Sequence, residues 1–243
     1  MTRALVCCLV AIAALPVAAA GSPVPGPQAT PPPKISQLVV FRNGTFKEKS
    51  ARARRIAVRV KGRRCLLPEG TPLSALASSK VAKLGLRDFG NCSTRARDAG
   101  GLFVNSIGSD VNAGQDGWVY KVGHKLGTAG AADPAGPFGH GLLKYGAHVL
   151  WFYCHFTNGS CQRTLSFSLI ATKPPGGLEV HLRAFDDQGR SMPAAGATVH
   201  VDAVTAVTGA DGSATLTTTA GTHNMWADQT GRIRSFTTRV VVQ

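Results

Sequence analysis

Short segments of β-type residues, separated by turn residues at regular intervals, constrain the fold of this chain more than any other feature. In its last third, such segments are expected at 178–185, 197–203, 213–219, 223–228 and 234–242. Turn pairs such as Asp211-Gly212 and Thr230-Gly231 separate them. Regular short strands with turns of this kind are typical of an antiparallel β-sandwich, so the sequence predicts a sandwich over residues 178–243.

The first half of the chain predicts further strands. Apolar residues alternate with basic or small ones at 56–60, which marks a half-buried strand. Similar β-type segments occur at 35–41, 102–107 and 117–122. Residues 42–53 are polar and basic, a composition that favours a loop.

One helix is expected in this half. Thr71 is a good N-cap, and Pro72 suits the first helical position. Apolar residues then recur at spacings of three and four between 73 and 84, and Gly85 is expected to end the helix. A helix of this length needs a sheet to pack against.

A strongly apolar segment in the middle of the chain predicts a hairpin. Residues 148–156 read as one strand and residues 164–170 as a strand that runs back. Asn158-Gly159-Ser160 supplies turn residues between them.

The N-terminus reads as an export signal followed by a linker. Arg3 precedes an uncharged apolar run that ends at Ala18-Ala19-Ala20, a small-residue cleavage site. No stretch after the cleaved signal is expected to span a membrane, and the chain is expected to be secreted or associated with the cell envelope. The predicted organisation is a signal peptide, a Pro- and Gly-rich linker, a first domain, a second linker and a sandwich domain, at 1–20, 21–34, 35–172, 173–177 and 178–243.

Four cysteines remain beyond the predicted signal, at 65, 92, 154 and 161. An even number in an exported chain favours disulfides, and four cysteines allow three connectivities. Pairing of sequence neighbours, Cys65–Cys92 and Cys154–Cys161, is the favoured one. A metal site is disfavoured because neither pair has C-x-x-C spacing.

The net charge of +14 is concentrated in one early segment. Residues 34–97 hold 16 Lys and Arg against three acids, whereas residues 98–243 hold 10 of each. The segment is either a solvated basic face or a site for a polyanion such as an anionic envelope polymer. Only Phe46 is an aromatic neighbour, which disfavours specific nucleic-acid recognition. The candidate residues are Arg52, Arg54, Arg55, Arg59, Lys61, Arg63 and Arg64.

Two aromatic pairs form the other candidate site. Trp118 and Tyr120 are two residues apart, as are Trp151 and Tyr153, so each pair shares one face of its strand. They are expected either in the core or along a ligand groove, with Tyr120 and Tyr153 the better groove residues because a hydroxyl suits a wet site.

Residues 54–156 resemble a family of exported bacterial domains related to the C-terminal domain of transcobalamin and intrinsic factor. The similarity lies in a strand and capped helix followed by LFVNSIGS, GWVYKVG (117–123) and GAHVLWFY (146–153). It implies a small ubiquitin-like (β-grasp-like) domain with one helix on a sheet. Ala147 replaces the usual acid of the family, and no part of the sequence matches the helical barrel that completes the cobalamin site in transcobalamin, so no cofactor is expected.

Residues 178–242 resemble the Ig-like and carboxypeptidase-regulatory-like sandwiches of secreted proteins, through PAAGATV (193–199) and TGADGSA (208–214). The expected fold class is therefore α+β, with a β-grasp-like domain followed by an antiparallel sandwich.

The sequence contains no G-x-S-x-G, S-x-x-K or H-E-x-x-H motif. A non-catalytic binding or adhesion module is expected, at the cell surface or in the medium, for a small molecule or a surface polymer. The alternative is tethering to a polyanion through residues 47–64. A third interpretation is an enzyme whose site uses His124, Asp133 and His140.

Overall fold

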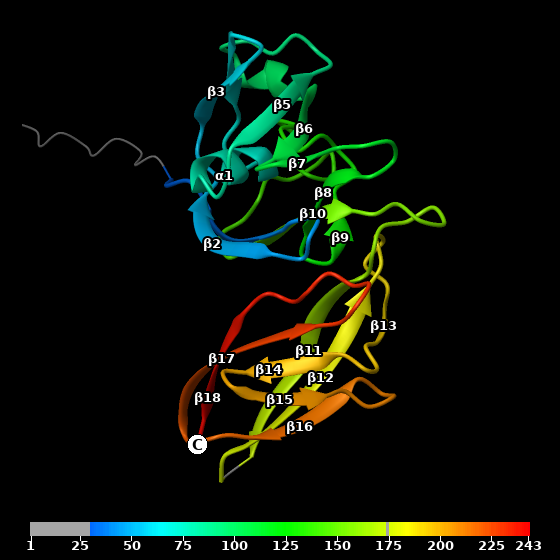
Figure 1. The fold of residues 1–243 in the computed structure, drawn as a ribbon. Helices are drawn as coiled ribbons and strands as arrows, with labels where there is room; N and C mark the ends of the chain where they lie inside the picture. Colours follow the sequence, from blue (N-terminus) through cyan, green and yellow to red (C-terminus); the bar gives the residue numbers. More distant parts are fainter. Residues whose placement is uncertain (1–29, 174) are drawn as a thin grey trace, which may run out of the picture. The chain divides into compact units, whose positions relative to one another are not determined.

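The chain is mostly β-structure, with 49% of it in strands and 6% in helices. The computed structural model describes residues 30–173 and 175–243, and Figure 1 labels most of their strands. The predicted β-rich fold is confirmed, while the predicted signal at 1–20 lies outside the described residues. Residues 32–243 form one compact unit. No helix of the described part is long and apolar enough to cross a membrane.

The first sheet is built around a parallel pair of strands. β1 (Lys34–Val40) and β10 (His148–Cys154) are this central pair. β2 (Phe46–Arg52) pairs antiparallel with β1, while β8 (Gly117–Val122) pairs antiparallel with β10 and is followed by β9 (Lys125–Leu126). The strand order is β2-β1-β10-β8-β9.

The expected loop at 42–53 is corrected by β2. Six of its seven side chains are exposed or half-buried, and only Ala51 is buried. Because β2 is an edge strand with one buried residue, its composition carries no apolar signal.

The helix α1 (Pro72–Ser79) begins where the sequence predicts and ends earlier. The Thr71 side chain accepts a hydrogen bond from the backbone N–H of Ser74, and Ser74 completes the capping box. Lys80 ends the helix in the left-handed conformation (φ 51°), so Gly85 is not its last residue. Gly85 lies instead in β5 (Leu84–Asp88).

Two small sheets complete the N-terminal lobe, which we define as residues 34–162. β3 (Ile56–Val60) and β4 (Arg63–Leu67) form a hairpin. β5, β6 (Leu102–Ile107) and β7 (Asp110–Val111) form a three-stranded sheet. Cys65 on β4 is bonded to Cys92, and their Cα atoms are 5.3 Å apart.

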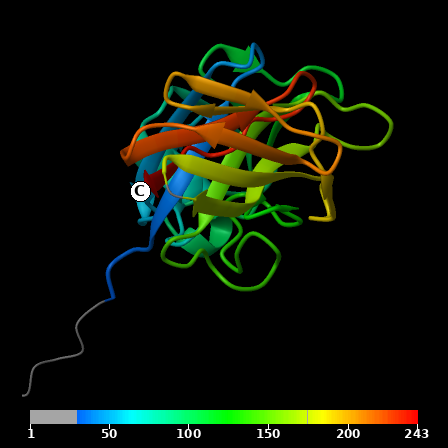
Figure 2. The same ribbon diagram turned by 90° about the horizontal axis from the view of Figure 1, so that it is seen from below.

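The C-terminal lobe, residues 163–243, contains two four-stranded sheets around one apolar core. Figure 2 shows these strands in a second view. The first sheet contains β11 (Thr164–Lys173), β12 (Gly177–Phe185), β13 (Ser191–Pro193) and β16 (Ser213–Thr217). The second contains β14 (Thr198–Val201), β15 (Val204–Val207), β17 (Gly221–Asp228) and β18 (Thr238–Val242).

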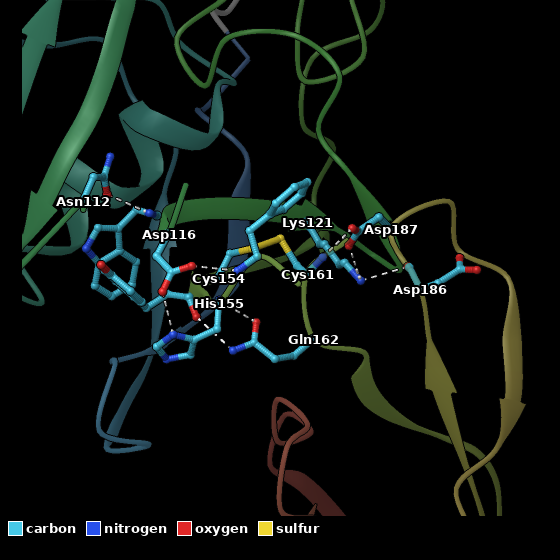
Figure 3. The surroundings of a disulfide bond; sticks show 12 residues. Asn112, Asp116, Lys121, Cys154, His155, Cys161, Gln162, Asp186 and Asp187 are labelled. Carbon is cyan, nitrogen blue, oxygen red and sulfur yellow. Dashed lines mark hydrogen bonds and ion pairs between the residues drawn. A yellow bond between two sulfur atoms is a disulfide. The ribbon is translucent and has the colours of Figure 1, made fainter. Parts of the chain in front are cut away.

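The predicted hairpin between 148–156 and 164–170 is wrong. β11 pairs antiparallel with β12, not with β10, and so belongs to the sheet of the following strands. Lys173 and Gly177, the ends of the predicted linker, are themselves paired residues of β11 and β12. Cys154 is bonded to Cys161, as expected, and this bridge closes the segment that leads from β10 toward β11 (Figure 3).

Both faces of β10 are buried. Val149, Trp151 and Tyr153 face the core of the N-terminal lobe. The alternate residues Leu150 and Phe152 belong to another apolar cluster, whose members from the C-terminal lobe are Ile233 and Phe236. The C-terminal lobe therefore covers the second face of the first sheet.

Lys121 on β8 lies in this interface and is fully buried. Its ammonium donates to the carbonyl of Asp186 at 2.9 Å and lies 3.4 Å from a carboxylate oxygen of Asp187 (Figure 3). Burial lowers the pKa of Lys121, and the Asp187 carboxylate opposes that shift.

Lys121→Met is expected to lower the free energy of unfolding by about 3 kcal/mol, because it leaves the buried Asp187 carboxylate without its cation. Urea unfolding at neutral pH measures this difference. Lys144→Met, at an exposed position, is the control. Equal stability of the two variants would contradict a structural role for the buried pair.

Candidate functional site

The four aromatic residues predicted as core or groove are buried in the N-terminal lobe. Trp118, Tyr120, Trp151 and Tyr153 are each 7% exposed or less. Cross-strand pairing on β8 and β10 places Tyr120 opposite Trp151, and Trp118 opposite Tyr153. Their ring centroids lie 5.2 Å and 5.9 Å apart, respectively. The four rings therefore form one packed aromatic cluster.

Backbone carbonyls satisfy most of the polar atoms of this cluster. The Tyr120 hydroxyl donates to the Ala129 carbonyl at 2.7 Å, and the Tyr153 hydroxyl donates to the Val111 carbonyl at 3.0 Å. The Trp118 indole N–H donates to the Asp110 carbonyl at 2.9 Å. The two tyrosine hydroxyls are therefore engaged in the fold.

A small apolar cavity of about 170 Å³ adjoins Trp118, Tyr120 and Trp151, between β6, β8 and the loop at 126–131. Ligand pockets for small molecules usually measure roughly 300–1,000 Å³. The size of this cavity therefore favours core packing for the three aromatic residues. Tyr153 lines a different and larger cleft.

Four of the predicted basic residues lie together on the β3–β4 hairpin. Arg59 stands directly opposite Arg64, and Val60 pairs with Arg63. Lys61 and Gly62 form the tight turn, with φ values of 48° and 79°. The side chains of Arg59, Lys61, Arg63 and Arg64 are all exposed. We call these four residues the basic hairpin.

The first disulfide extends this surface. It holds Cys92 beside β4, where the Leu66 N–H donates to the Ser93 carbonyl at 2.8 Å. The exposed Arg95 follows in the same segment. Arg95 was not among the candidate residues because it is far from 59–64 in the sequence, and the disulfide and this hydrogen bond bring its segment to β4.

Other predicted basic residues lie elsewhere. Lys47 and Lys49 on β2 donate to the carbonyls of Val81 and Ser79 at the end of α1, at 2.8 Å and 3.0 Å. Arg52 donates to the Pro32 carbonyl at 3.2 Å. Arg54 and Arg55 are exposed in the connection before β3. The basic segment at 47–64 is thus divided between structural contacts and the hairpin.

A cleft of about 620 Å³ lies where the lobes meet and was not predicted. Its N-terminal wall includes Arg42, Phe46 and Tyr153, and its C-terminal wall includes Trp226 and the loop at 228–234. We call it the arginine cleft, because Arg42, Arg232 and Arg234 line it against one acid, Asp228.

A stack of planar groups forms one wall of the arginine cleft. The Arg234 guanidinium lies 3.5 Å from the ring centroid of Phe46 and 4.3 Å from that of Trp226. His200 stacks on Trp226, with ring centroids 3.8 Å apart. Contact with two rings holds the guanidinium plane in place and joins the lobes.

The loop residues considered for an enzyme make separate contacts. His124 stacks on Phe185 at 3.7 Å, and burial lowers its pKa. An Asp133 carboxylate oxygen accepts the Ala135 N–H at 2.8 Å, and His140 adjoins Phe138. Within the described ranges, no group of three or more His, Cys, Asp or Glu side chains is placed to hold a metal ion.

Comparison of the chain with known protein families, curated proteins and solved structures finds no match. Geometry and charge alone identify two candidate sites, the basic hairpin and the arginine cleft.

Burial raises the pKa of Tyr120 above its usual 10.0, and Asp133 adds to the rise. The unfolded chain loses this proton above about pH 10 while the folded chain keeps it. The free energy of unfolding should then fall by about 1.4 kcal/mol per pH unit through this group. Stability conferred by the protonated hydroxyl is complete below pH 10 and declines above it.

Tyr120→Phe should remove this fall in the free energy of unfolding with rising pH, as measured by urea unfolding between about pH 8 and 11. Tyr145→Phe, at an 81% exposed position, should keep it. Identical slopes for the two variants would show that Tyr120 ionises normally in the folded chain.

Proposed function

We propose that this protein is a non-catalytic, extracytoplasmic binding module that attaches to an anionic polymer of the cell envelope through the basic hairpin. The observation that carries the proposal is the direct pairing of Arg59 with Arg64. Like charges opposite each other on paired strands destabilise a hairpin. A polyanion that lies across both arginines would reverse that repulsion.

The surroundings of the hairpin support this proposal. Among the described residues, the hairpin forms an ion pair with one acid, Asp88, whose largely buried carboxylate lies 3.8 Å from the Arg63 guanidinium. The positive charge of Arg59, Lys61 and Arg64 is left without an ion pair among the described residues. Phe89 follows Asp88 in the chain and is 75% exposed.

The proposed location outside the cytoplasm is supported by the two disulfides, which form and persist in oxidising compartments. The Cys65–Cys92 bridge, together with the Leu66–Ser93 hydrogen bond, holds the segment that carries Arg95 beside β4. The proposal therefore links the redox compartment to the binding surface.

The proposal also includes a fold type for each lobe. The parallel pair β1 and β10, flanked by antiparallel strands and with α1 packed on the sheet, supports a ubiquitin-like (β-grasp-like) N-terminal domain. The two antiparallel sheets of the C-terminal lobe support an Ig-like or carboxypeptidase-regulatory-like sandwich. Domains of these kinds serve many functions, so the fold alone does not select a ligand.

The double substitution Arg59→Gln and Arg64→Gln should separate binding from stability. Binding to immobilised teichoic acid, an anionic wall polymer, should fall at least about tenfold in low salt, because two contacts to the polyanion are lost. The free energy of unfolding should stay equal or rise by up to about 1 kcal/mol, because the repulsion is removed.

Lys83→Gln with Lys144→Gln makes the same change in net charge at two other exposed positions and should retain binding. Binding by the unmodified protein should weaken about 100-fold between roughly 50 and 200 mM salt if four cations contact the polymer. Equal losses in the two double variants, or tighter binding to single-stranded DNA than to teichoic acid, would contradict the proposal.

A further inference from the structure

The arginine cleft contains a buried cation that is only partly satisfied. Arg234 is 6% exposed, and its Nε donates to the Ser235 carbonyl at 3.0 Å while Nη2 donates to the Thr237 hydroxyl at 3.3 Å. Its Nη1 is buried and has no hydrogen-bond partner among the described residues. A guanidinium remains charged at any physiological pH, so this N–H requires an acceptor from outside the described residues.

A second arginine repeats this arrangement two residues earlier. Arg232 is half-buried and lines the same cleft. Its Nη1 is also buried without a partner in the part of the chain that the structure describes. One short segment thus places two guanidinium groups with unpaired donors at one cleft, and the exposed Arg42 lies on the opposite wall.

The acids near the cleft are engaged with other groups. Both carboxylate oxygens of Glu48 accept the Thr237 N–H, at 3.0 Å and 3.2 Å. Asp228 lies 3.2 Å from Nε2 of His200. Asp116 lies 3.0 Å from Nδ1 of His155 (Figure 3). Glu48 and Asp228 act on the Arg234 charge through space. Within the described residues, however, neither Arg232 nor Arg234 forms an ion pair, so both guanidinium groups have room for an oxyanion from outside.

An unpaired acceptor accompanies these donors. Gln229 lines the cleft, and its Nε2 donates to the Ala195 carbonyl at 2.8 Å, which assigns the other amide atom as oxygen. This oxygen, Oε1, is buried and has no described partner. It would accept a hydrogen bond from a hydroxyl of a ligand.

We infer that the arginine cleft binds a sugar-like ligand that carries one carboxylate or phosphate group. The oxyanion pairs with the guanidinium groups of Arg232 and Arg234, as both groups favour planar, charge-assisted hydrogen bonds. A neighbouring hydroxyl donates to Gln229. The volume of about 620 Å³ lies within the usual range for small-molecule sites. This site shares no residue with the basic hairpin and goes beyond the proposed function.

Isothermal titration calorimetry on the full chain tests the inference with three probes. Glucuronate supplies a carboxylate, glucose 6-phosphate supplies a phosphate, and glucose has the hydroxyls without the charge. At least one of the charged sugars should bind, and at least tenfold more tightly than glucose. The charged sugar that binds more tightly identifies the oxyanion as a carboxylate or a phosphate. Failure of both to bind at millimolar concentration, or equal binding of glucose, would overturn the inference.

Matched variants locate the site. Arg232→Gln should weaken binding of the charged sugar at least tenfold, whereas Arg239→Gln, an equal charge change at an exposed position on β18, should not. Gln229→Leu should weaken binding of the charged sugar but not binding of acetate, which has no hydroxyl. Circular dichroism confirms that each variant is folded, and Arg234→Lys replaces Arg232→Gln if that variant unfolds. Equal effects of Arg232→Gln and Arg239→Gln would contradict the assignment.

Discussion

Burial of both faces of β10 is the constraint on which the rest of the structure depends. A strand with side chains alternating between two apolar surfaces needs a partner layer on each side. The N-terminal lobe supplies one layer around Trp151 and Tyr153. Ile233 and Phe236 of the C-terminal lobe contribute to the other, over Leu150 and Phe152. Because each large apolar side chain contributes roughly 1.5–3 kcal/mol on burial, exposing this face would be costly.

The same constraint explains where polar groups gather. Lys121 lies on the face of β8 opposite to Trp118 and Tyr120. If side chains of β8 simply alternated between core and solvent, Lys121 would be exposed to water. The C-terminal lobe covers it, and its charge is met by Asp187 and backbone carbonyls. At another part of the junction, Phe46 meets Arg234, and the arginine cleft opens beside this contact.

Features that depend on neighbouring residues were predictable from the sequence. The strands near 56–60, 102–107 and 117–122 follow from local alternation, and the start of α1 follows from Thr71 and Pro72. The pairing of Cys65 with Cys92, and of Cys154 with Cys161, follows the expected pairing of sequence neighbours. These signals act over a few residues, or over one short loop.

Features that depend on the contact between lobes were not predictable. The assignment of β11 to the second lobe follows from its pairing with β12, whereas its sequence fits a hairpin with β10 equally well. Arg232 and Arg234 occur in a part of the chain with no net charge, so composition does not mark them. The cleft exists only because residues about 190 positions apart, such as Phe46 and Arg234, come together.

Differential scanning calorimetry of the full chain tests this account most directly. If both faces of β10 must be covered, residues 32–243 should unfold in one transition, with a calorimetric enthalpy equal to the van't Hoff enthalpy. Two separate transitions, or a calorimetric enthalpy well above the van't Hoff value, would show that the lobes fold independently and would contradict the account.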